Sequence, residues 1–81
     1  MVEKTVTVTA PEGLHARPAG AIVKIVKDSG CSVSLSTASR TVRGDSMLGI
    51  LSLGLKCGTE VRISVEGTGE ETVMDSILCQ L

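Results

Sequence analysis

The chain has 81 residues, of which 42% are hydrophobic, and eight basic against nine acidic residues leave a formal charge of −1. This length suits one small domain with a single core, and the balanced charge argues against nucleic acid, whose binders carry a basic footprint. Phe, Tyr and Trp are absent. The core must therefore be built from aliphatic side chains and Met, and the aromatic platforms that single-strand binders use are missing.

The chain shows no signal peptide, and its longest apolar run, residues 47–55, is too short to cross a bilayer. We therefore expect a cytoplasmic protein with no membrane partner. The chain has three widely spaced cysteines and no CxxC pair: Cys31, Cys57 and Cys79. Together with one histidine they are a poor set of zinc ligands, unless the fold brings them close together. We expect no metal, no cofactor, and thiols that are reduced and at least partly buried.

The first half of the chain predicts a strand, a helix and a second strand. Residues 2–8 alternate between apolar and polar, and residues 9–13 are rich in turn formers. Helical spacing starts at Ala16, and Gly30 is a plausible helix stop. Residues 31–37 alternate most clearly of all, with serines on the wet face. The apolar stripe of the predicted helix consists of Ala19, Ile22, Val23 and Val26.

The second half predicts two strands and two helices. A turn at 38–39 leads into a short return strand at 40–43, and residues 46–53 form a short helix. Residues 60–66 alternate again, and a final helix follows the glycine-rich turn at 67–69. The buried side of that helix should carry Val73, Met74, Ile77, Leu78 and Leu81.

The resulting element order is βαββαβα. One face of each predicted strand is apolar and the other carries Thr, Ser or charged residues. The helices should therefore cover one face of an antiparallel sheet and leave the other to water, which defines an α+β fold in a single domain over residues 1–81. Periodicity does not give the order of the strands within the sheet.

The segment Gly13-Leu14-His15-Ala16-Arg17-Pro18-Ala19 holds the only histidine. Pro18 suits the first turn of a helix, so His15 or Ala16 takes the N-cap. Free amides at a helix start form an anion site and bias an adjacent imidazole towards its neutral, nucleophilic form. Arg17 offers a planar fork of donors to phosphate oxygens. A lone histidine is more often a surface or capping residue, but this setting favours a site for a phosphoryl group.

The short helix at 46–53 has two apolar stripes, and a small domain cannot easily bury both. We predict that Ile50 and Leu53 face the core, and that an exposed interaction patch is formed by Met47, Leu48 and Leu51. The alternative is that both stripes are buried. Ser46 is expected at the N-cap, where its oxygen accepts an orphan amide, and this role alone would explain it.

Two blocks, residues 13–19 and 45–54, resemble the active-site signature and the regulatory-serine region of HPr, the histidine-containing phosphocarrier family of the bacterial phosphoenolpyruvate–sugar phosphotransferase system. The resemblance implies an open-faced β-sandwich, with a four-stranded antiparallel sheet and three helices on one face. It implies that Nδ1 of His15 accepts a phosphoryl group from enzyme I and passes it to sugar-specific IIA domains. Arg17 and the amides of Ala16 and Arg17 would hold the phosphate oxygens, in a stoichiometric carrier rather than an enzyme.

The same resemblance places the partner surface beside the start of the first helix and across the short helix. Some family members are phosphorylated at the serine matching Ser46 by HPr kinase/phosphorylase, and a catabolite-control transcription factor is a further implied partner. We expect a monomer. Two alternatives are a regulatory paralogue, which the presence of His15 argues against, and a small α/β binding module whose histidine has no special role. The implied partner-binding residues are Gly20, Lys24, Lys27, Met47, Leu48 and Leu51.

Overall fold

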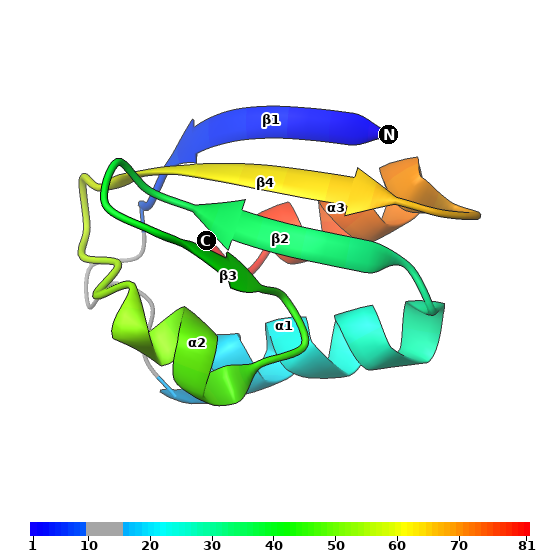
Figure 1. The fold of residues 1–81 in the computed structure, drawn as a ribbon, viewed down its shortest axis with the longest axis horizontal. Helices are drawn as coiled ribbons and strands as arrows, with labels where there is room; N and C mark the ends of the chain where they lie inside the picture. The colour runs from blue at the N-terminus through cyan, green and yellow to red at the C-terminus, as the bar shows by residue number, and fades with distance from the viewer. Residues whose placement is uncertain (10–15) are drawn as a thin grey trace.

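The computed structural model describes residues 1–9 and 16–81, and it confirms the predicted βαββαβα order. The neighbouring strands are all antiparallel, in the spatial order β1-β4-β2-β3. The helices lie together on one side of the sheet, which is the predicted open-faced sandwich (Figure 1). The elements are β1 (Val2–Thr7), α1 (Ala16–Ser29), β2 (Ser32–Ser36), β3 (Thr41–Arg43), α2 (Met47–Ser52), β4 (Glu60–Glu66) and α3 (Glu70–Leu78).

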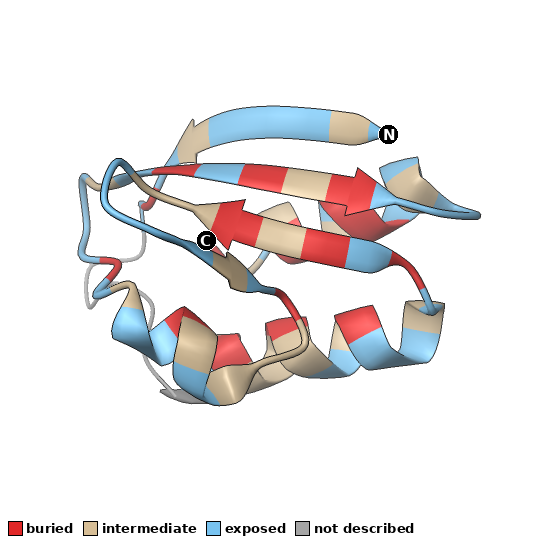
Figure 2. Cartoon of the chain, viewed as in Figure 1, coloured by how far each residue is buried: buried red, intermediate tan, exposed pale blue. Residues whose placement is uncertain are grey.

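The strand registers gather the apolar side chains on the face that the helices cover. Ile63 of β4 stands opposite Lys4 of β1 on one side and Leu35 of β2 on the other, and both Ile63 and Leu35 are fully buried. Arg62 and Ser34 are the neighbours of these two residues along the strands. Since successive side chains of a strand alternate between its faces, both lie on the open face of the sheet. Figure 2 shows the alternation along β2 and β4, with the buried sides of the helices turned towards the sheet. The predicted alternation of 31–37 and 60–66 is therefore confirmed.

Helix α1 is held by side chains at helical spacing. Ala19 and Ile22 are completely buried, and Val26 is nearly so. Gly30 ends the helix with φ +72°, and its N–H donates to the Val26 carbonyl at 3.3 Å. Only glycine adopts this left-handed conformation at little cost, so the predicted helix stop is confirmed.

A bulge joins the end of β1 to the start of β4. The Val8 N–H donates to the Thr59 carbonyl at 2.9 Å, while the Val8 carbonyl accepts from the Gly58 N–H at 2.8 Å. Gly58 and Thr59 of one strand therefore both lie opposite Val8 of the other. Gly58 has the positive φ, +92°, that this kind of bulge requires. Val8 is 1% exposed, so the strand leaves the sheet from a firmly buried position.

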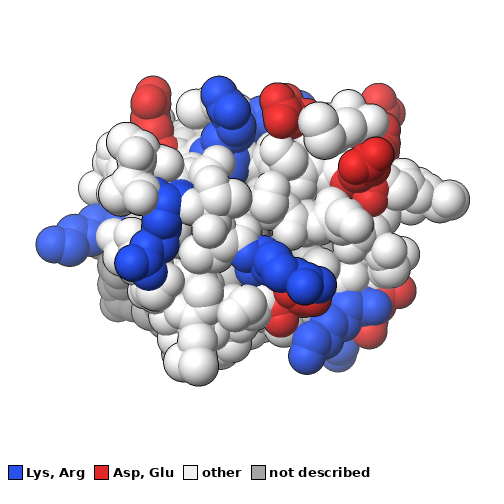
Figure 3. Space-filling view, in the orientation of Figure 1, with Lys and Arg blue, Asp and Glu red and all other residues white. Residues whose placement is uncertain are grey.

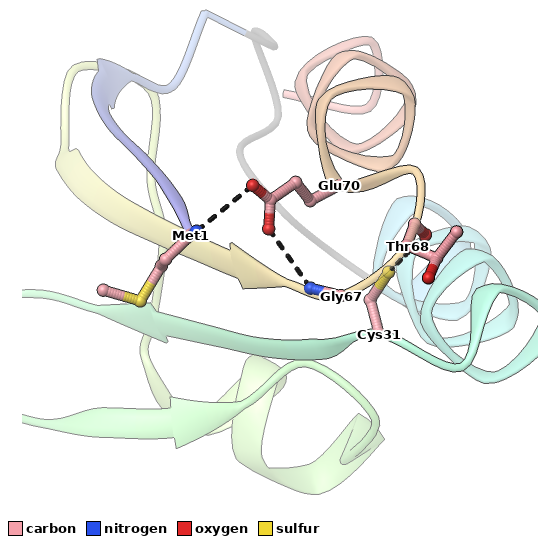
Figure 4. Close-up of polar contacts among 5 residues, drawn as sticks. All are labelled: Met1, Cys31, Gly67, Thr68 and Glu70. Carbon is pink, nitrogen blue, oxygen red and sulfur yellow. Dashed lines mark hydrogen bonds and ion pairs between the residues drawn. The ribbon is translucent and has the colours of Figure 1, made fainter.

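Contacts at the opposite end of β1 tie the strand to α3 (Figure 4). The Met1 ammonium lies 3.1 Å from Oε1 of Glu70, and the Gly67 N–H donates to Oε2 at 3.2 Å. These two interactions, the ammonium first, lower the pKa of the Glu70 carboxyl. The buried Cys31 thiol donates to the Thr68 carbonyl at 3.3 Å and holds the same turn. None of the predicted site residues belongs to this cluster, which is structural.

Candidate functional site

The predicted phosphate site lies at the start of α1. His15, the predicted acceptor, falls in residues 10–15, outside the described residues. The helix begins at Ala16, Pro18 sits in its first turn as predicted, and Arg17 is exposed. The first amides of a helix have no partner within the helix itself, and Ala16 and Arg17 occupy its first two positions. Pro18 has no N–H to add.

One stripe of α1 carries four of the predicted site residues. Arg17, Gly20, Lys24 and Lys27 recur at intervals of three and four residues, so they share a helix face. The three charged members are exposed and Gly20 is half-buried. A Cβ at Gly20 would lie 3.5 Å from Cε of Met47, which is ordinary contact. Gly20 therefore marks where α1 meets α2, and the structure brings the two predicted halves of the partner surface together.

Helix α2 turns one apolar stripe inward and part of the other outward. Ile50 is 1% exposed, whereas Leu48 is 80% and Leu51 38% exposed. The predicted burial of Ile50 and the predicted exposure of Leu48 and Leu51 are confirmed. The predicted exposure is wrong for Met47, which is half-buried and packs against the core, because α1 lies beside it at Gly20. Leu53, predicted in the core, is the C-cap residue of α2 and is half-buried against the margin of the core.

The exposed part of α2 forms an uncharged surface, which we call the α2 patch and define as Leu48 and Leu51. Helix α2 contains no charged residue, and Figure 3 shows an uncharged area over it with Lys and Arg side chains along its border. Exposed leucines that lie close together on a monomer are typical of a surface for protein contacts.

Ser46 is the N-cap of α2, as predicted. Its backbone is extended, and its Oγ accepts the Gly49 N–H at 3.0 Å. A Cβ at Gly49 would lie 3.0 Å from that Oγ and 3.1 Å from Cβ of Val42, so glycine leaves room for the cap. Just before the helix, Arg43 and Asp45 form an ion pair, with 2.9 Å between Nη2 and Oδ2. The sequence indicated the cap but not the reason for Gly49.

The C-terminal end of α2 carries a contact that the sequence did not indicate. The Ser52 hydroxyl donates to the Gly49 carbonyl at 2.6 Å and accepts from Nη1 of Arg40 at 3.0 Å. Arg40 belongs to the β2–β3 hairpin, and a cation at a helix C-terminus complements the helix dipole. Only the three-dimensional approach of hairpin and helix reveals this pair, because nothing in the spacing of residues 40 and 52 points to it.

The three thiols are free, but their burial differs from the expectation. Cys31 is buried, whereas Cys57 and Cys79 are exposed, so the expectation of partial burial is wrong for these two. Cys57 lies in the loop before β4, and Cys79 directly follows α3. Within residues 1–9 and 16–81, no three His, Cys, Asp or Glu side chains lie close enough together to hold a metal ion.

No helix within the described ranges is long and apolar enough to cross a membrane.

Comparison with known proteins identifies the family. A family model described as the PTS HPr component phosphorylation site matches residues 2–80. The phosphocarrier protein HPr of Xylella fastidiosa (strain Temecula1) is 34% identical over 77 residues, covering 95% of this chain and 86% of that protein. The crystal structure of HPr from Bacillus anthracis superposes with a TM-score of 0.90 at 29% identity, covering 99% and 95% of the two chains.

A second similar structure is that of Crh, the catabolite repression containing protein of Bacillus subtilis. It superposes with a TM-score of 0.74 at 30% identity, covering 99% of this chain and 92% of that one, and it is described as an intertwined dimer with a swapping domain. The fold and the match along nearly the whole chain define a small phosphocarrier protein. The chain belongs to the HPr family of the phosphotransferase system.

Proposed function

We propose that this chain carries a phosphoryl group on His15, which it accepts from phospho-enzyme I and passes to IIA domains of sugar permeases. The observation that supports this most strongly is the HPr family match over residues 2–80, with the signature residues Ala16 and Arg17 at the start of α1. Phosphoryl transfer needs alignment and charge stabilisation more than covalent chemistry from the protein. A carrier with one acceptor needs neither a cofactor nor a metal, and it has no turnover of its own.

The chemistry follows from the neutral imidazole. The Nδ1 lone pair of His15 forms a bond to phosphorus while the bond between phosphorus and the donor group breaks, and the second transfer reverses these roles. The Arg17 guanidinium and the N–H groups of Ala16 and Arg17 hold the phosphate oxygens. The positive end of the α1 dipole stabilises the same charge.

Labelling with phosphoenolpyruvate and enzyme I tests the proposal. The chain should acquire a phosphate that is labile in acid and stable in base, and His15→Ala should abolish labelling while leaving the circular dichroism spectrum unchanged. Arg17→Ala should slow labelling, whereas Arg62→Ala, a matched change on the open face of the sheet, should not. Absence of labelling with several active enzymes I would refute the carrier function. Labelling of His15→Ala would refute the acceptor.

The partner surface in this proposal joins the α2 patch to the basic stripe of α1. Leu48 and Leu51 supply apolar area, and Arg17, Lys24 and Lys27 supply positive charge on an adjoining helix. Gly20 and Met47 form the seam between these parts. A carrier must leave each partner quickly, so the interface should be modest in area. The charge implies partners with acidic surfaces.

Ser46 is a second phosphoryl site in this proposal, modified by HPr kinase/phosphorylase and read by a catabolite-control transcription factor. The similarity to Crh, a protein named for catabolite repression, favours this use. A phosphate there would place negative charge beside the α2 patch and change the choice of partner. The cap bond explains Ser46 without regulation, so the decisive test is labelling by ATP and the kinase. Ser46→Ala should remove that label while labelling at His15 persists.

We further propose that residues 1–81 act as one cytoplasmic domain that works as a monomer and binds no nucleic acid. Size-exclusion chromatography with light scattering measures the oligomeric state directly. An intertwined dimer like that of Crh, persisting at dilution, would contradict the monomer.

A further inference from the structure

A tight turn joins β3 to α2 and brings a guanidinium, a carboxylate and a hydroxyl together. The Ser46 N–H donates to the Arg43 carbonyl at 3.2 Å, which closes a β-turn over residues 43–46. Such a turn keeps its first and last Cα atoms within about 7 Å of each other. Gly44 holds the turn in place: its N–H donates to the Val33 carbonyl at 2.8 Å, and a Cβ there would lie 2.7 Å from Cγ1 of Val33. Arg43 and Ser46 are therefore neighbours across a fixed turn.

The guanidinium of Arg43 is bound at the surface and by a weak contact. Its Nη2 lies 2.9 Å from Oδ2 of Asp45, and the side chain of Arg43 is 81% exposed, against 34% for that of Asp45. An exposed ion pair contributes little free energy, because water screens both charges. Arg43 can therefore exchange Asp45 for a stronger anion at little cost.

Phosphorylation of Ser46 would create such an anion in the next residue. Ser46 is half-buried, and its Oγ accepts the Gly49 N–H at 3.0 Å. In the proposed regulation, Oγ loses its proton and forms a bond to the γ-phosphorus of ATP, while the bond from that phosphorus to the bridging oxygen breaks and ADP leaves. The phosphate carries a charge of about −1.5 to −2 and three acceptor oxygens. It therefore competes with the adjacent Asp45 carboxylate for the same cation.

We propose that Arg43 is the phosphate clamp of Ser46: on phosphorylation its guanidinium leaves Asp45 and binds the phosphoserine oxygens. The inference rests on the proposed phosphorylation of Ser46. A guanidinium binds phosphate through two parallel N–H donors, in a stronger contact than the exposed pair it replaces.

The exchange changes the charge beside the α2 patch. Before modification, Arg43 and Asp45 cancel each other's charge. Afterwards, Asp45 and the phosphate together outweigh Arg43 and leave a net charge of about −2 at the turn. The clamp fixes where this charge is presented, so a partner that binds phosphorylated Ser46 should carry a basic surface, and a partner with an acidic surface is repelled.

Phosphorus NMR of the full chain, with phosphoserine encoded at position 46, tests the clamp without the kinase. A bound guanidinium favours the doubly charged phosphate, so it lowers the second pKa of phosphoserine from its ordinary value of about 6. Arg43→Gln should therefore raise the pH midpoint of the phosphorus signal by about half a pH unit. Arg40→Gln is the matched control and should leave the midpoint unchanged, because the Arg40 guanidinium binds Ser52 at the other end of α2.

Two further variants separate an exchange of partners from a general electrostatic effect. Asp45→Asn removes the competing acceptor, so the midpoint should fall, and Arg43→Gln should then raise it by more than it does in the native chain. Lys27 of α1 lines the same surface hollow, of about 530 Å³, as Arg43 and Asp45. Lys27→Gln should move the midpoint less than Arg43→Gln does. Circular dichroism checks the fold of each variant, and Arg43→Lys, which cannot bind two oxygens in parallel, replaces Arg43→Gln if the latter does not fold.

Equal midpoints in the native chain and in Arg43→Gln would overturn the clamp, as would a shift of the same size in Arg40→Gln or a larger one in Lys27→Gln. The proposed regulation fails separately, if the kinase and ATP do not label Ser46. The encoded phosphoserine then still decides the role of Arg43, because its midpoint does not depend on the kinase.

Discussion

Helices α1 and α2 lie side by side, yet they are held in different ways. Helix α1 spans Ala16–Ser29 and is anchored by fully buried Ala19 and Ile22. Helix α2 has six residues, buries only Ile50, and depends on a cap at Ser46. Because a short helix gains little from its own hydrogen bonds, α2 relies on its cap and one anchor. Helix α1, which is expected to carry the chemistry, is therefore fixed by the core. Helix α2, which is expected to bind partners, buries only one residue.

The largest expected effect tests the anchor of α1. Ile22→Ala should destabilise the protein by about 3 kcal/mol, because it removes a fully buried side chain and leaves a cavity. Urea unfolding followed by far-UV circular dichroism measures the loss, since the chain has no Trp or Tyr for fluorescence. Lys24→Ala, exposed on the same helix, should stay within about 0.5 kcal/mol. Equal losses of unfolding free energy in the two variants would mean that the burial of Ile22 does not hold α1 in place.

The next effect tests the cap of α2. Ser46→Ala should cost about 1 kcal/mol, because the Gly49 N–H loses its acceptor. Ser46→Asn, which retains an accepting oxygen, should recover most of this loss. The same unfolding experiment measures both, and an unchanged stability in Ser46→Ala would show that the cap is not what holds α2.

A smaller effect on stability separates surface from core within α2. Leu48→Ser should change the free energy of unfolding by at most about 0.5 kcal/mol, because Leu48 is 80% exposed. If the α2 patch meets enzyme I, the same variant should raise KM several-fold at unchanged kcat, since it weakens binding rather than chemistry. Thr72→Ser, exposed on α3, is the control and should change neither quantity.

The smallest effect lies outside both helices and depends on pH. The Met1 ammonium and the Gly67 N–H lower the pKa of Glu70 below its usual value of 4.5. A carboxyl with a lowered folded pKa contributes stability that is present above its unfolded pKa and lost as the pH falls through the folded one. The native chain should therefore lose stability below about pH 4.5 more steeply than Glu70→Gln, in urea midpoints measured across this range. Glu71→Gln, in the same helical turn, should follow the native curve.

The sequence predicted the elements well where periodicity is strong. The alternation in 31–37 and 60–66 indicated both central strands, and Gly30 and Ser46 indicated a helix end and a helix cap, because these features depend on neighbours along the chain. The strand order β1-β4-β2-β3 could not be predicted in this way, since it depends on which distant edges meet. The alternation of apolar and polar residues indicated a sheet with one face open to water, and the family resemblance implied the same open-faced sandwich.

The site was predicted in part, for a similar reason. The exposure of Leu48 and Leu51 followed from helical spacing, but the half-buried position of Met47 depends on its approach to Gly20, in another helix. The sequence indicates Thr9 only as part of a segment rich in turn formers. Its hydrogen bonds to the Leu81 carbonyl join residues 72 positions apart, and no local pattern records them. The assignments to His15 and to the partner residues remain predictions.

The place of β1 at the sheet edge has a consequence for biosynthesis. Strand β1 leaves the ribosome before the other three strands, yet its neighbour in the sheet is β4, and the backbone oxygen of Leu81 that accepts from Thr9 follows 72 residues later. The backbone of β1 therefore stays unpaired until β4 has emerged. Closing such long loops is slow compared with forming local helices. During translation this edge is the part of the chain most exposed to mispairing or to capture by chaperones.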